Sequence, residues 1–387
     1  MFVIERITDK KNNSGILWGE HMKQLKKVLV LLITAILLVT VCACGKSPAS
    51  DQGTETKTVT DSLNRQVEVP VKVDRIVTLS NVPRMAVYLG LTDKIVGYSG
   101  MEPEKVQPLT AYAYAVKDEL ADVPIVGTDA GGNTDYYPEA IIEAAPDVIL
   151  CGYPEDVVKE LEEQTGIPVV SVAMGNIFEE DYDEALRVIA KTCGVEDRAE
   201  EVIAYVDDCL KDIDDRTKDI PEADKPSVLS AAATFKGAHG IEGVRIADPV
   251  LTALHANNVA AQDTDNKSTA VEVDKEQILD WNPDYIFCDY GGVPLVKQDM
   301  SENPSFYKNL KAFNEGKMYQ HPSSTSYYAN LEISLANAYF IGSILYPEQF
   351  SDIQINDKAN DIFEFFLGEK DYMSELEGIG AQYSVIQ

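Results

Sequence analysis

Histidine is scarce in this chain: only four of its 387 residues are histidines, and three of these lie beyond the N-terminal region. Receptors for bare zinc or manganese ions need histidine and carboxylate ligands that converge on one point. His239, His255 and His321 are far apart in the sequence and lack the spacing of a metal site. The sequence therefore predicts no directly bound metal ion and no cofactor of the chain's own.

The six cysteines lack the CxxC spacing of a zinc knuckle and the dense pattern of a disulfide scaffold. Four of them are scattered through the main part of the chain: Cys151, Cys193, Cys209 and Cys288. We expect these four to be buried thiols. A bridge between Cys193 and Cys209 stays open as the alternative.

Basic residues are outnumbered, because 33 lysines and arginines stand against 64 aspartates and glutamates, a net charge of −31. Such a charge repels nucleic acid and favours solubility. The sequence also lacks a Gly-x-Ser-x-Gly elbow, a phosphate-binding glycine loop and a metalloprotease histidine pair. We therefore expect neither a nucleic-acid partner nor an enzyme. A secreted lipoprotein enzyme with a site built from distant residues is the alternative of another class.

The N-terminal apolar run, Val28–Val41, is too short for a membrane-spanning helix. It has 14 residues, two of them threonines, whereas a spanning helix needs about 20. Three lysines, Lys23, Lys26 and Lys27, precede it, which is typical of a signal peptide. We assign residues 1–43 to this leader. Whether translation starts at Met1 or Met22 stays open.

The run ends in Val-Cys-Ala-Cys44-Gly, which resembles a bacterial lipobox. Cys44 fits as the lipid-modified residue and new N-terminus, and an ordinary secretory leader is the alternative. Residues 44–57 are polar and contain almost nothing apolar, so we expect a flexible tether. Removing residues 1–43 takes away six basic and three acidic residues, which leaves 27 and 61 and a charge of −34.

Short apolar runs alternate with amphipathic stretches of helical length beyond the tether. Examples of the apolar runs are residues 75–79, 95–98, 148–151 and 169–172. This alternation is typical of βαβ units and parallel sheets. The sequence thus predicts an α/β fold.

Residues 195–220 contain dense charge, one apolar stripe and neither glycine nor proline, which predicts a long helix. We expect this helix to join two lobes, each a parallel-rich sheet flanked by helices. The predicted lobes are residues 58–194 and residues 221–387.

An internal repeat supports two similar lobes. Glu139-Ala-Ile-Ile-Glu-Ala-Ala-Pro-Asp-Val-Ile-Leu-Cys151 aligns without a gap on Glu276-Gln-Ile-Leu-Asp-Trp-Asn-Pro-Asp-Tyr-Ile-Phe-Cys288. Each copy predicts a short helix, a Pro-Asp turn and a buried strand. The matched apolar positions favour a duplication over chance.

In this arrangement the sequence resembles the class III periplasmic binding proteins, the receptors for iron-siderophore, haem and cobalamin import. The resemblance runs from about Thr58 to Phe350. Besides the repeat, three segments carry it: Val59–Leu79, Asn257–Ala260 and Leu345–Phe350. It implies a monomeric substrate-binding lipoprotein of an ABC importer, anchored on the outer face of a bacterial cell membrane. Its partners would be a permease dimer with ATPase subunits.

The ligand that this resemblance implies is a metal chelate, and an iron(III)-siderophore complex is our first expectation. Haem and cobalamin are the alternatives. Which chelate is bound cannot be read from the residues.

Candidate ligand contacts follow the predicted strands, because ligands of open α/β sheets lie beyond the carboxyl ends of the strands. Aromatic rings suit a flat or apolar chelate, and cations suit its anionic oxygens. The predicted ligand-binding residues are Arg84, Tyr98, Met101, Tyr153, Met174, Phe235, Lys236, His239, Arg245, Tyr290, Tyr327 and Tyr328. His239 could ligate haem iron or donate a hydrogen bond to a chelate, and an exposed loop histidine is the alternative.

Glu139 and Glu276 begin the two copies of the repeat. In the family that the chain resembles, a glutamate at the matching place in each lobe meets arginines of the permease. The resemblance therefore implies that both residues dock the permease. The alternative is that each glutamate only stabilises the positive end of its helix. We further expect little lobe motion on ligand binding, because a continuous helix between lobes resists bending.

Overall fold

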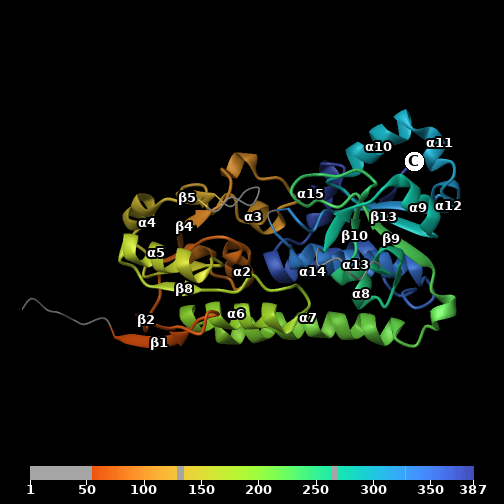
Figure 1. Cartoon of the computed structure of the whole chain (residues 1–387). Helices are drawn as coiled ribbons and strands as arrows, with labels where there is room; N and C mark the ends of the chain where they lie inside the picture. Colours follow the sequence, from red (N-terminus) through yellow and green to blue (C-terminus); the bar gives the residue numbers. More distant parts are fainter. Residues whose placement is uncertain (1–54, 129–134, 263–268, 327) are drawn as a thin grey trace, which may run out of the picture. The chain divides into compact units, whose positions relative to one another are not determined.

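Strands and helices alternate along the chain in the computed structural model, which describes residues 55–128, 135–262, 269–326 and 328–387 (Figure 1). The predicted signal peptide, Cys44 with most of the tether, and Tyr327 lie outside the described residues. Within these ranges, no helix is both long and apolar enough to cross a bilayer.

The N-terminal lobe is built on a sheet with the strand order β6-β5-β4-β3-β7-β8 in the described part of the chain. All neighbours in it are parallel except β5 and β6. Its strands are β3 (Ile76–Thr78), β4 (Ile95–Ser99), β5 (Ile125–Thr128), β6 (Asp135–Tyr136), β7 (Val148–Cys151) and β8 (Val169–Ser171). The helices of the lobe are α2 (Val82–Tyr88), α3 (Ala111–Ala115), α4 (Pro138–Ala144), α5 (Glu155–Thr165) and α6 (Glu180–Cys193). A hairpin of β1 (Thr56–Thr60) and β2 (Gln66–Pro70) precedes them.

The C-terminal lobe has a second sheet, with the order β12-β10-β9-β13-β14-β15 and β11 beside β9 among the described residues. β9, β13 and β14 are parallel, and β10 runs antiparallel to β9. Its strands are β9 (Ser227–Ala231), β10 (Gly243–Arg245), β11 (Asn257–Asn258), β12 (Ala270–Glu272), β13 (Tyr285–Asp289), β14 (Met318–His321) and β15 (Ser384–Val385). The first helices of the lobe are α8 (Pro249–Ala253), α9 (Lys275–Trp281), α10 (Val293–Glu302), α11 (Pro304–Tyr307) and α12 (Lys311–Asn314). The predicted mixed α/β fold is therefore confirmed.

The long helix between the sheets is α7 (Glu196–Thr217), the green helix at the bottom of Figure 1. Its apolar stripe is buried, as the sequence predicts, and comprises Val202, Ile203, Val206, Cys209 and Ile213. The helix packs against α6 of the first lobe and α8 of the second.

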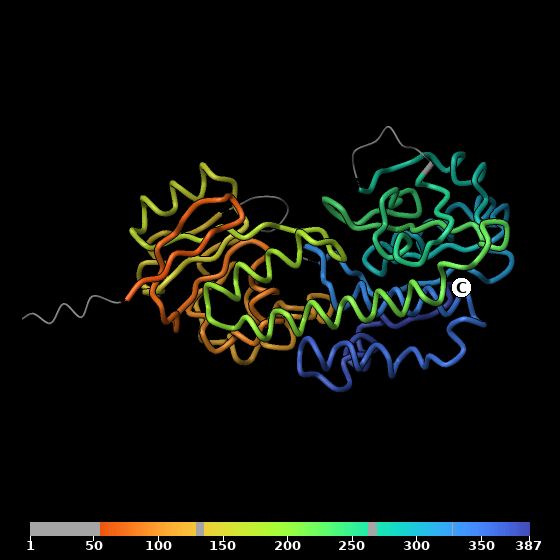
Figure 2. The backbone as a smooth tube through the Cα atoms, turned by 90° about the horizontal axis from the view of Figure 1, so that it is seen from below, coloured from red at the N-terminus to blue at the C-terminus, as the bar shows by residue number. Residues whose placement is uncertain are grey.

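The C-terminal helices form a further connection between the lobes. They are α13 (Leu331–Leu345), α14 (Ile355–Leu367) and α15 (Tyr372–Gly378), and α14 packs on both α2 and α3 of the first lobe (Figure 2). The Tyr88 and Phe366 rings are 5.1 Å apart, and the Tyr372 hydroxyl donates a 2.7 Å hydrogen bond to the Pro108 carbonyl. The chain after β14 therefore returns to the first lobe.

The two copies of the repeat fold alike at the start of their strands. Each short helix is followed by a residue with left-handed backbone, Ala145 after α4 and Asn282 after α9. The Asp147 carboxylate then accepts the Arg75 amide at 2.9 Å, just before β3. In the second copy the Asp284 carboxylate accepts the amide of the first β9 residue at 2.8 Å.

The strand ends match as well. The pairing of β3 with β7 in the first lobe has the same register as the pairing of β9 with β13 in the second lobe. Ser80, after β3, and Ala232, after β9, therefore occupy equivalent positions. Both have positive φ, 62° and 56°. The backbone thus turns in the same way at the carboxyl end of the first strand of each lobe, which is where the sequence places the ligand.

Candidate ligand-binding site

The carboxyl ends of β3, β7 and β8 meet around Ser80, Asn81, Gly152 and Met174. The Asn81 side-chain amide donates to the Met174 carbonyl at 3.1 Å, and the Ser80 hydroxyl lies 3.5 Å from the Met174 sulfur. Gly152 fits here because a Cβ atom on it would lie 2.4 Å from the Asn81 side-chain oxygen. Met174 itself is 44% exposed, so this edge presents a thioether to solvent.

Arg84 of α2 reaches from the first lobe to the segment after β14. Its guanidinium donates a 2.8 Å hydrogen bond to the Ala329 carbonyl, and its Cζ atom lies 5.0 Å from the Tyr112 ring centroid and 5.3 Å from that of Tyr328. Thr110 and Ser326 make a second contact, with their hydroxyl oxygens 2.6 Å apart. Arg84 is only 1% exposed, so these groups cover it.

A buried carboxyl group lies close to Arg84. Glu332, in the first turn of α13, accepts a short hydrogen bond from the Tyr88 hydroxyl of α2. Burial raises the pKa of the Glu332 carboxyl, while the Tyr88 hydrogen bond and the charge of Arg84 oppose that rise. Burial also raises the pKa of Tyr88 far above its usual value, so its hydroxyl stays a donor. The lobes therefore meet through a charged and hydrogen-bonded contact.

Hydroxyl groups and one arginine gather at the carboxyl ends of β9, β13 and β14. Arg245 lies 3.6 Å from the buried Asp289 carboxylate and donates a 3.2 Å hydrogen bond to the Thr325 hydroxyl. The Thr234 hydroxyl is 2.5 Å from that of Thr325 and 3.3 Å from that of Ser323. These five residues form one polar cluster, which we call the Arg245 cluster. A guanidinium with adjacent hydroxyls can bind anionic oxygens.

His239 belongs to a tight turn, in which the Phe235 amide donates to the Gly237 carbonyl at 2.9 Å. One ring nitrogen lies 2.9 Å from the Glu272 carboxylate and the other 2.8 Å from the Phe235 carbonyl. Partial burial lowers the pKa of the imidazole, but the hydrogen bonds to Glu272 and Phe235 outweigh burial and raise the pKa above its usual value. Lys236, in the same turn, is exposed with a φ of 52°. For His239 to ligate haem iron, one of these hydrogen bonds would have to break.

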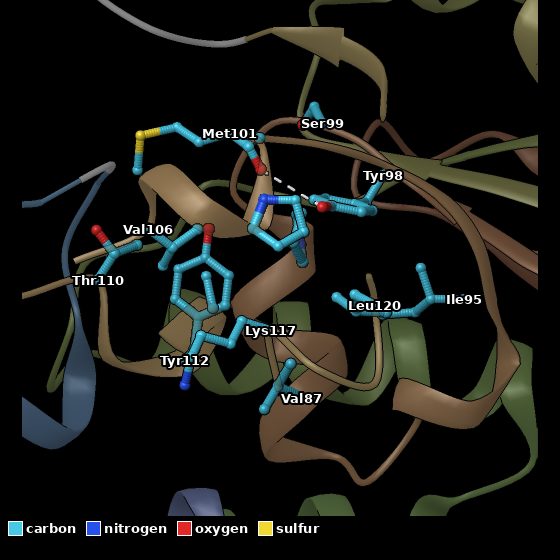
Figure 3. A pocket seen from close by; sticks show the side chains of 14 residues that line it. Val87, Ile95, Tyr98, Ser99, Met101, Val106, Thr110, Tyr112, Lys117 and Leu120 are labelled. Atoms are coloured by element: carbon cyan, nitrogen blue, oxygen red, sulfur yellow. Dashed lines mark hydrogen bonds between the residues drawn. The ribbon is translucent and has the colours of Figure 1, made fainter. Parts of the chain in front are cut away.

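A small apolar pocket lies between β4, α2 and α3 (Figure 3). Its volume is about 20 Å³, which is room for about one water molecule. Tyr98, Met101 and Tyr112 line it, and Figure 3 shows the Tyr98 hydroxyl directed at the Met101 carbonyl, 3.4 Å away. The buried Ser99 hydroxyl, also in the lining, has no hydrogen-bond partner among the described residues. Tyr98 and Met101 thus lie together in the first lobe.

The remaining candidate tyrosines are held by packing or by a hydrogen bond. Tyr153 is buried in the core of the first lobe, with its ring 6.0 Å from that of Tyr136. The Tyr290 hydroxyl donates to the Ile379 carbonyl near the C-terminus. Tyr328 lies over Arg84 with a positive φ of 81°. Of the twelve predicted residues, the structure therefore brings Arg84 together with Tyr328, Tyr98 with Met101, and Phe235 with His239.

Sequence reasoning missed the small hydroxyl residues. Thr110, Thr234, Ser323, Thr325 and Ser326 all belong to the contacts described above. A signal was available, because Ser323–Ser326 is an unbroken run of serine and threonine, which the structure places just after β14. Hydroxyl residues are common in ordinary loops, so the run does not stand out without the fold.

Metal-binding and redox groups do not gather in the described ranges. No group of three or more histidine, cysteine, aspartate or glutamate side chains could hold a metal ion there. The four cysteines among the described residues are free and buried, so Cys193 and Cys209 form no bridge. Burial raises the pKa of the Cys193 thiol to about 12, so it is protonated at neutral pH.

Comparison with known proteins assigns the family. The family model described as "Periplasmic binding protein" matches residues 76–325, more than half of the chain. The chain belongs to the periplasmic binding protein family. Membership in this family of binding proteins, together with the fold, points to a binding role rather than to catalysis.

Three relatives with known sequences match most of the chain. An uncharacterized ABC transporter substrate-binding lipoprotein, YvrC, of Bacillus subtilis is 25% identical over 75% of this chain and 87% of its own. An iron-uptake system-binding protein of the same organism is 25% identical over 76% and 90%. The molybdate-binding protein MolA of Haemophilus influenzae is 24% identical over 84% and 94%.

Solved structures of this family share the fold. A periplasmic solute binding protein from Veillonella parvula superposes with a TM-score of 0.64 at 22% identity, over 84% of this chain and 96% of its own. MolA bound to molybdate superposes with a TM-score of 0.62 at 21% identity, over 81% and 98%. At this identity the likeness supports the fold, and the relatives differ in what their names say they bind.

Proposed function

We propose that this chain is the substrate-binding lipoprotein of an ABC importer and that it captures an anionic iron(III) chelate between its lobes. The observation that carries the proposal is the position of the two candidate arginines. In a chain with 64 acidic residues, Arg84 of one lobe and Arg245 of the other both donate hydrogen bonds to the segment after β14. Arg245 with its neighbouring hydroxyls suits an anionic, oxygen-rich ligand, and the buried Arg84 fixes the same segment to the first lobe.

The class of ligand follows from the side chains at these edges. Met174, Tyr328 and Phe235 offer apolar and aromatic surface, and the Arg245 cluster offers hydroxyls and a cation. A chelator that wraps a ferric ion in catecholate or hydroxamate oxygens presents both kinds of surface. The iron-uptake relative supports this ligand. Haem and cobalamin remain alternative chelates for the same role.

A small oxyanion such as molybdate is a second candidate ligand. The observation in its favour is the Arg245 cluster, in which the Thr234 hydroxyl lies within hydrogen-bonding distance of the Ser323 and Thr325 hydroxyls. The molybdate-binding relative has nearly the same identity as the iron-uptake relative. Such an ion would need only this cluster, whereas a chelate would also contact the first lobe.

A ligand panel tests the proposal. Purified protein would be titrated with a ferric catecholate, a ferric hydroxamate, haem, cobalamin and molybdate, followed by calorimetry and by tyrosine fluorescence. We expect a ferric chelate to bind and Arg245→Gln to weaken it at least tenfold, about 1.4 kcal/mol. Arg187→Gln, which removes an exposed pair with Glu200, is the matched control and should not change affinity. Binding of molybdate alone would favour the oxyanion, and chemical conversion of a bound chelate would favour an enzyme.

The lipid anchor is a separate prediction. If Cys44 carries the anchor, Cys44→Ala should release the protein from the membrane into the medium, because residue 44 can then carry no acyl chain. Cys42→Ala is the control and should leave the protein attached. Fractionation of cells and immunoblotting would measure both. If only Cys42→Ala releases the protein, Cys42 and not Cys44 carries the anchor.

Docking to the permease is proposed for Glu139 and Glu276. Both are exposed in the first turn of their helices, α4 and α9, which hold equivalent places in the two lobes. Two such carboxylates suit a partner with two-fold symmetry. The double variant Glu139→Ala, Glu276→Ala should retain ligand affinity but lose uptake. Normal uptake by cells with the double variant would leave these residues as helix-start carboxylates.

A further inference from the structure

Asp289, the last residue of β13, is a buried acid within the Arg245 cluster. The ungapped alignment of the two repeat copies matches Cys151 with Cys288, so the position equivalent to Asp289 in the first lobe is Gly152. The duplicated fold therefore does not require an acid at this strand end, since a glycine serves there. The carboxylate distinguishes the second lobe from the first.

The turn after β13 uses the side chain of Asp289 but does not need its charge. One carboxylate oxygen accepts the Gly291 amide at 2.9 Å, and the other accepts the Thr234 hydroxyl at 3.3 Å. The side-chain oxygen of an asparagine could accept the Gly291 amide in the same way, and asparagine suits such turns as well as aspartate does. The presence of an acid rather than an amide thus has another reason.

The negative charge of Asp289 acts on Arg245. A guanidinium nitrogen of Arg245 lies 3.6 Å from the carboxylate, and the side chain of Arg245 is 14% exposed whereas that of Asp289 is 3% exposed. Two opposite charges this close largely cancel for a ligand that lies further away. Arg245 can therefore still donate hydrogen bonds to a ligand, but the pair presents little net positive charge.

The other candidate cations add little charge that a ligand could use. Arg84 is 1% exposed. The His239 ring is paired with Glu272, and Lys236 is exposed, so that salt screens its charge. The chain that carries these groups has 64 acidic residues against 33 basic ones. A ligand with several negative charges would therefore meet a repulsion that the candidate cations do not offset.

We propose that Asp289 determines the charge of the ligand, an inference that rests on the proposed function and narrows it. The ligand is a ferric hydroxamate with a single net negative charge, and Asp289 excludes ferric catecholates. Three hydroxamates neutralise Fe(III), because each carries one negative charge, whereas three catecholates leave a threefold negative charge on the complex. Arg245 then binds one anionic group at the edge of the hydroxamate ligand, such as a single carboxylate.

Titrations with two probes test this role: a ferric trihydroxamate with one free carboxylate, and a ferric tricatecholate. Wild-type protein should bind the trihydroxamate more tightly, by roughly tenfold or more. Asp289→Asn should raise the affinity for the tricatecholate roughly tenfold, and that for the trihydroxamate only about twofold, because the Coulomb energy is proportional to the charge of the ligand. Asp280→Asn is the matched control, since it removes the same charge from the exposed side of α9 and should change neither affinity.

A structural role of Asp289 alone would predict a different result, because a loosened cluster should weaken both probes alike. Equal effects of Asp289→Asn on the two probes would therefore overturn the inference, provided that circular dichroism shows a folded variant. If the variant does not fold, the salt dependence of the wild-type protein decides.

That salt dependence needs no variant. The affinity of the wild-type protein for the tricatecholate should rise or stay constant between about 50 and about 500 mM salt, because salt then screens a repulsion. Tighter binding of the tricatecholate than of the trihydroxamate, with an affinity that falls steeply as salt is added, would overturn the inference. If no ferric chelate binds the wild-type protein at all, the proposed function itself fails, which separates the two results.

Discussion

Gly152 shows how tightly single residues are fitted at the carboxyl ends of the first-lobe strands. A Cβ atom there would lie 2.4 Å from the Asn81 side-chain oxygen and 3.0 Å from the Ser80 hydroxyl. Both neighbours are themselves buried and held, Asn81 by two backbone carbonyls of the segment after β8. The backbone at this edge has no room to accept a larger residue without moving its neighbours.

Gly152→Ala should therefore lower the free energy of unfolding by about 1–3 kcal/mol, the usual cost of overpacking. Urea unfolding followed by circular dichroism would measure it. Gly378→Ala is the control, because no atom lies within 4 Å of a Cβ at this helical position. It should be neutral or stabilising by about 0.4–1 kcal/mol. Equal stability of Gly152→Ala and wild type would mean that the Asn81 side chain can move away from the added methyl group at no cost.

The imidazole of His239 makes the turn after β9 sensitive to pH. Its pKa is raised above the usual value of 6.5 by the contacts with Glu272 and Phe235, which outweigh partial burial. A group with a raised pKa contributes stability that is fully present below its unfolded pKa. That contribution is lost as the pH rises through the folded pKa. The contacts of His239 should therefore stabilise the turn more at pH 6 than at pH 8.

Glu272→Gln should lower the pKa of His239, because the variant removes the carboxylate that favours the imidazolium. Proton-nitrogen NMR of the ring would follow the titration in both proteins. His239→Gln would mark the His239 resonance by its disappearance. An unchanged titration in Glu272→Gln would show that the Phe235 carbonyl alone raises the pKa.

At the scale of elements, the duplicated helix-turn-strand unit is the feature that the sequence predicted best. Its aspartates explain why: each carboxylate holds the amide at the start of the neighbouring parallel strand, Asp147 for Arg75 and Asp284 for Ser227. The Pro-Asp pair is therefore visible in sequence as a repeat and in structure as a hydrogen-bonded contact between strands.

Asp284→Ala should destabilise the protein more than Asp147→Ala. Both remove hydrogen bonds to backbone amides, each worth about 0.5–1.5 kcal/mol. Asp147 accepts two amides, those of Asp74 and Arg75. Asp284 accepts one amide and the hydroxyl of Ser227 and also pairs with Lys311, so it loses three contacts. We expect losses of about 1–3 kcal/mol in chemical unfolding. Asp280→Ala, on the exposed side of α9, is the control and should change stability by less than about 0.5 kcal/mol. The reverse order of the two variants would contradict this account.

The sequence predicted less about contacts between distant elements. Strands, the interlobe helix and the repeat depend on periodic apolar residues, which can be read locally. The path of α14 onto α2 and α3 depends on which faces meet, such as Phe366 against Tyr88, and no local pattern encodes that choice. The same holds for the site. Arg84 was found because it follows a strand, but its cover by Tyr112 and Tyr328 was not foreseeable.

At the scale of the whole molecule, two separate connections link the lobes in the part of the chain that the structure describes. The first is α7, which packs on helices of both. The second runs through α13 to α15, where Glu332 binds Tyr88, and where the Glu375 carboxylate accepts a 2.8 Å hydrogen bond from the Tyr114 hydroxyl of α3. A hinge motion of the lobes would have to bend a continuous helix and also break these two contacts, of which the one between Tyr88 and Glu332 is buried. This second connection strengthens the expectation of limited motion, which stays a prediction.

Solution scattering with and without ligand tests that expectation at the scale where it belongs. The radius of gyration should change by less than about 0.5 Å on saturation, whereas hinge closure moves whole domains. Tyrosine fluorescence should still report binding.

A double variant, Tyr88→Phe with Tyr372→Phe, removes the hydroxyls that bind Glu332 and the Pro108 carbonyl and keeps the rings in place. It should bind ligand but show a larger change in radius, because only α7 and apolar packing then restrain the lobes. Ser374→Ala, which removes an exposed hydroxyl on α15, is the control. A contraction of several ångströms in the wild-type protein would show that these contacts break on binding, and that the structure represents only one of two lobe arrangements.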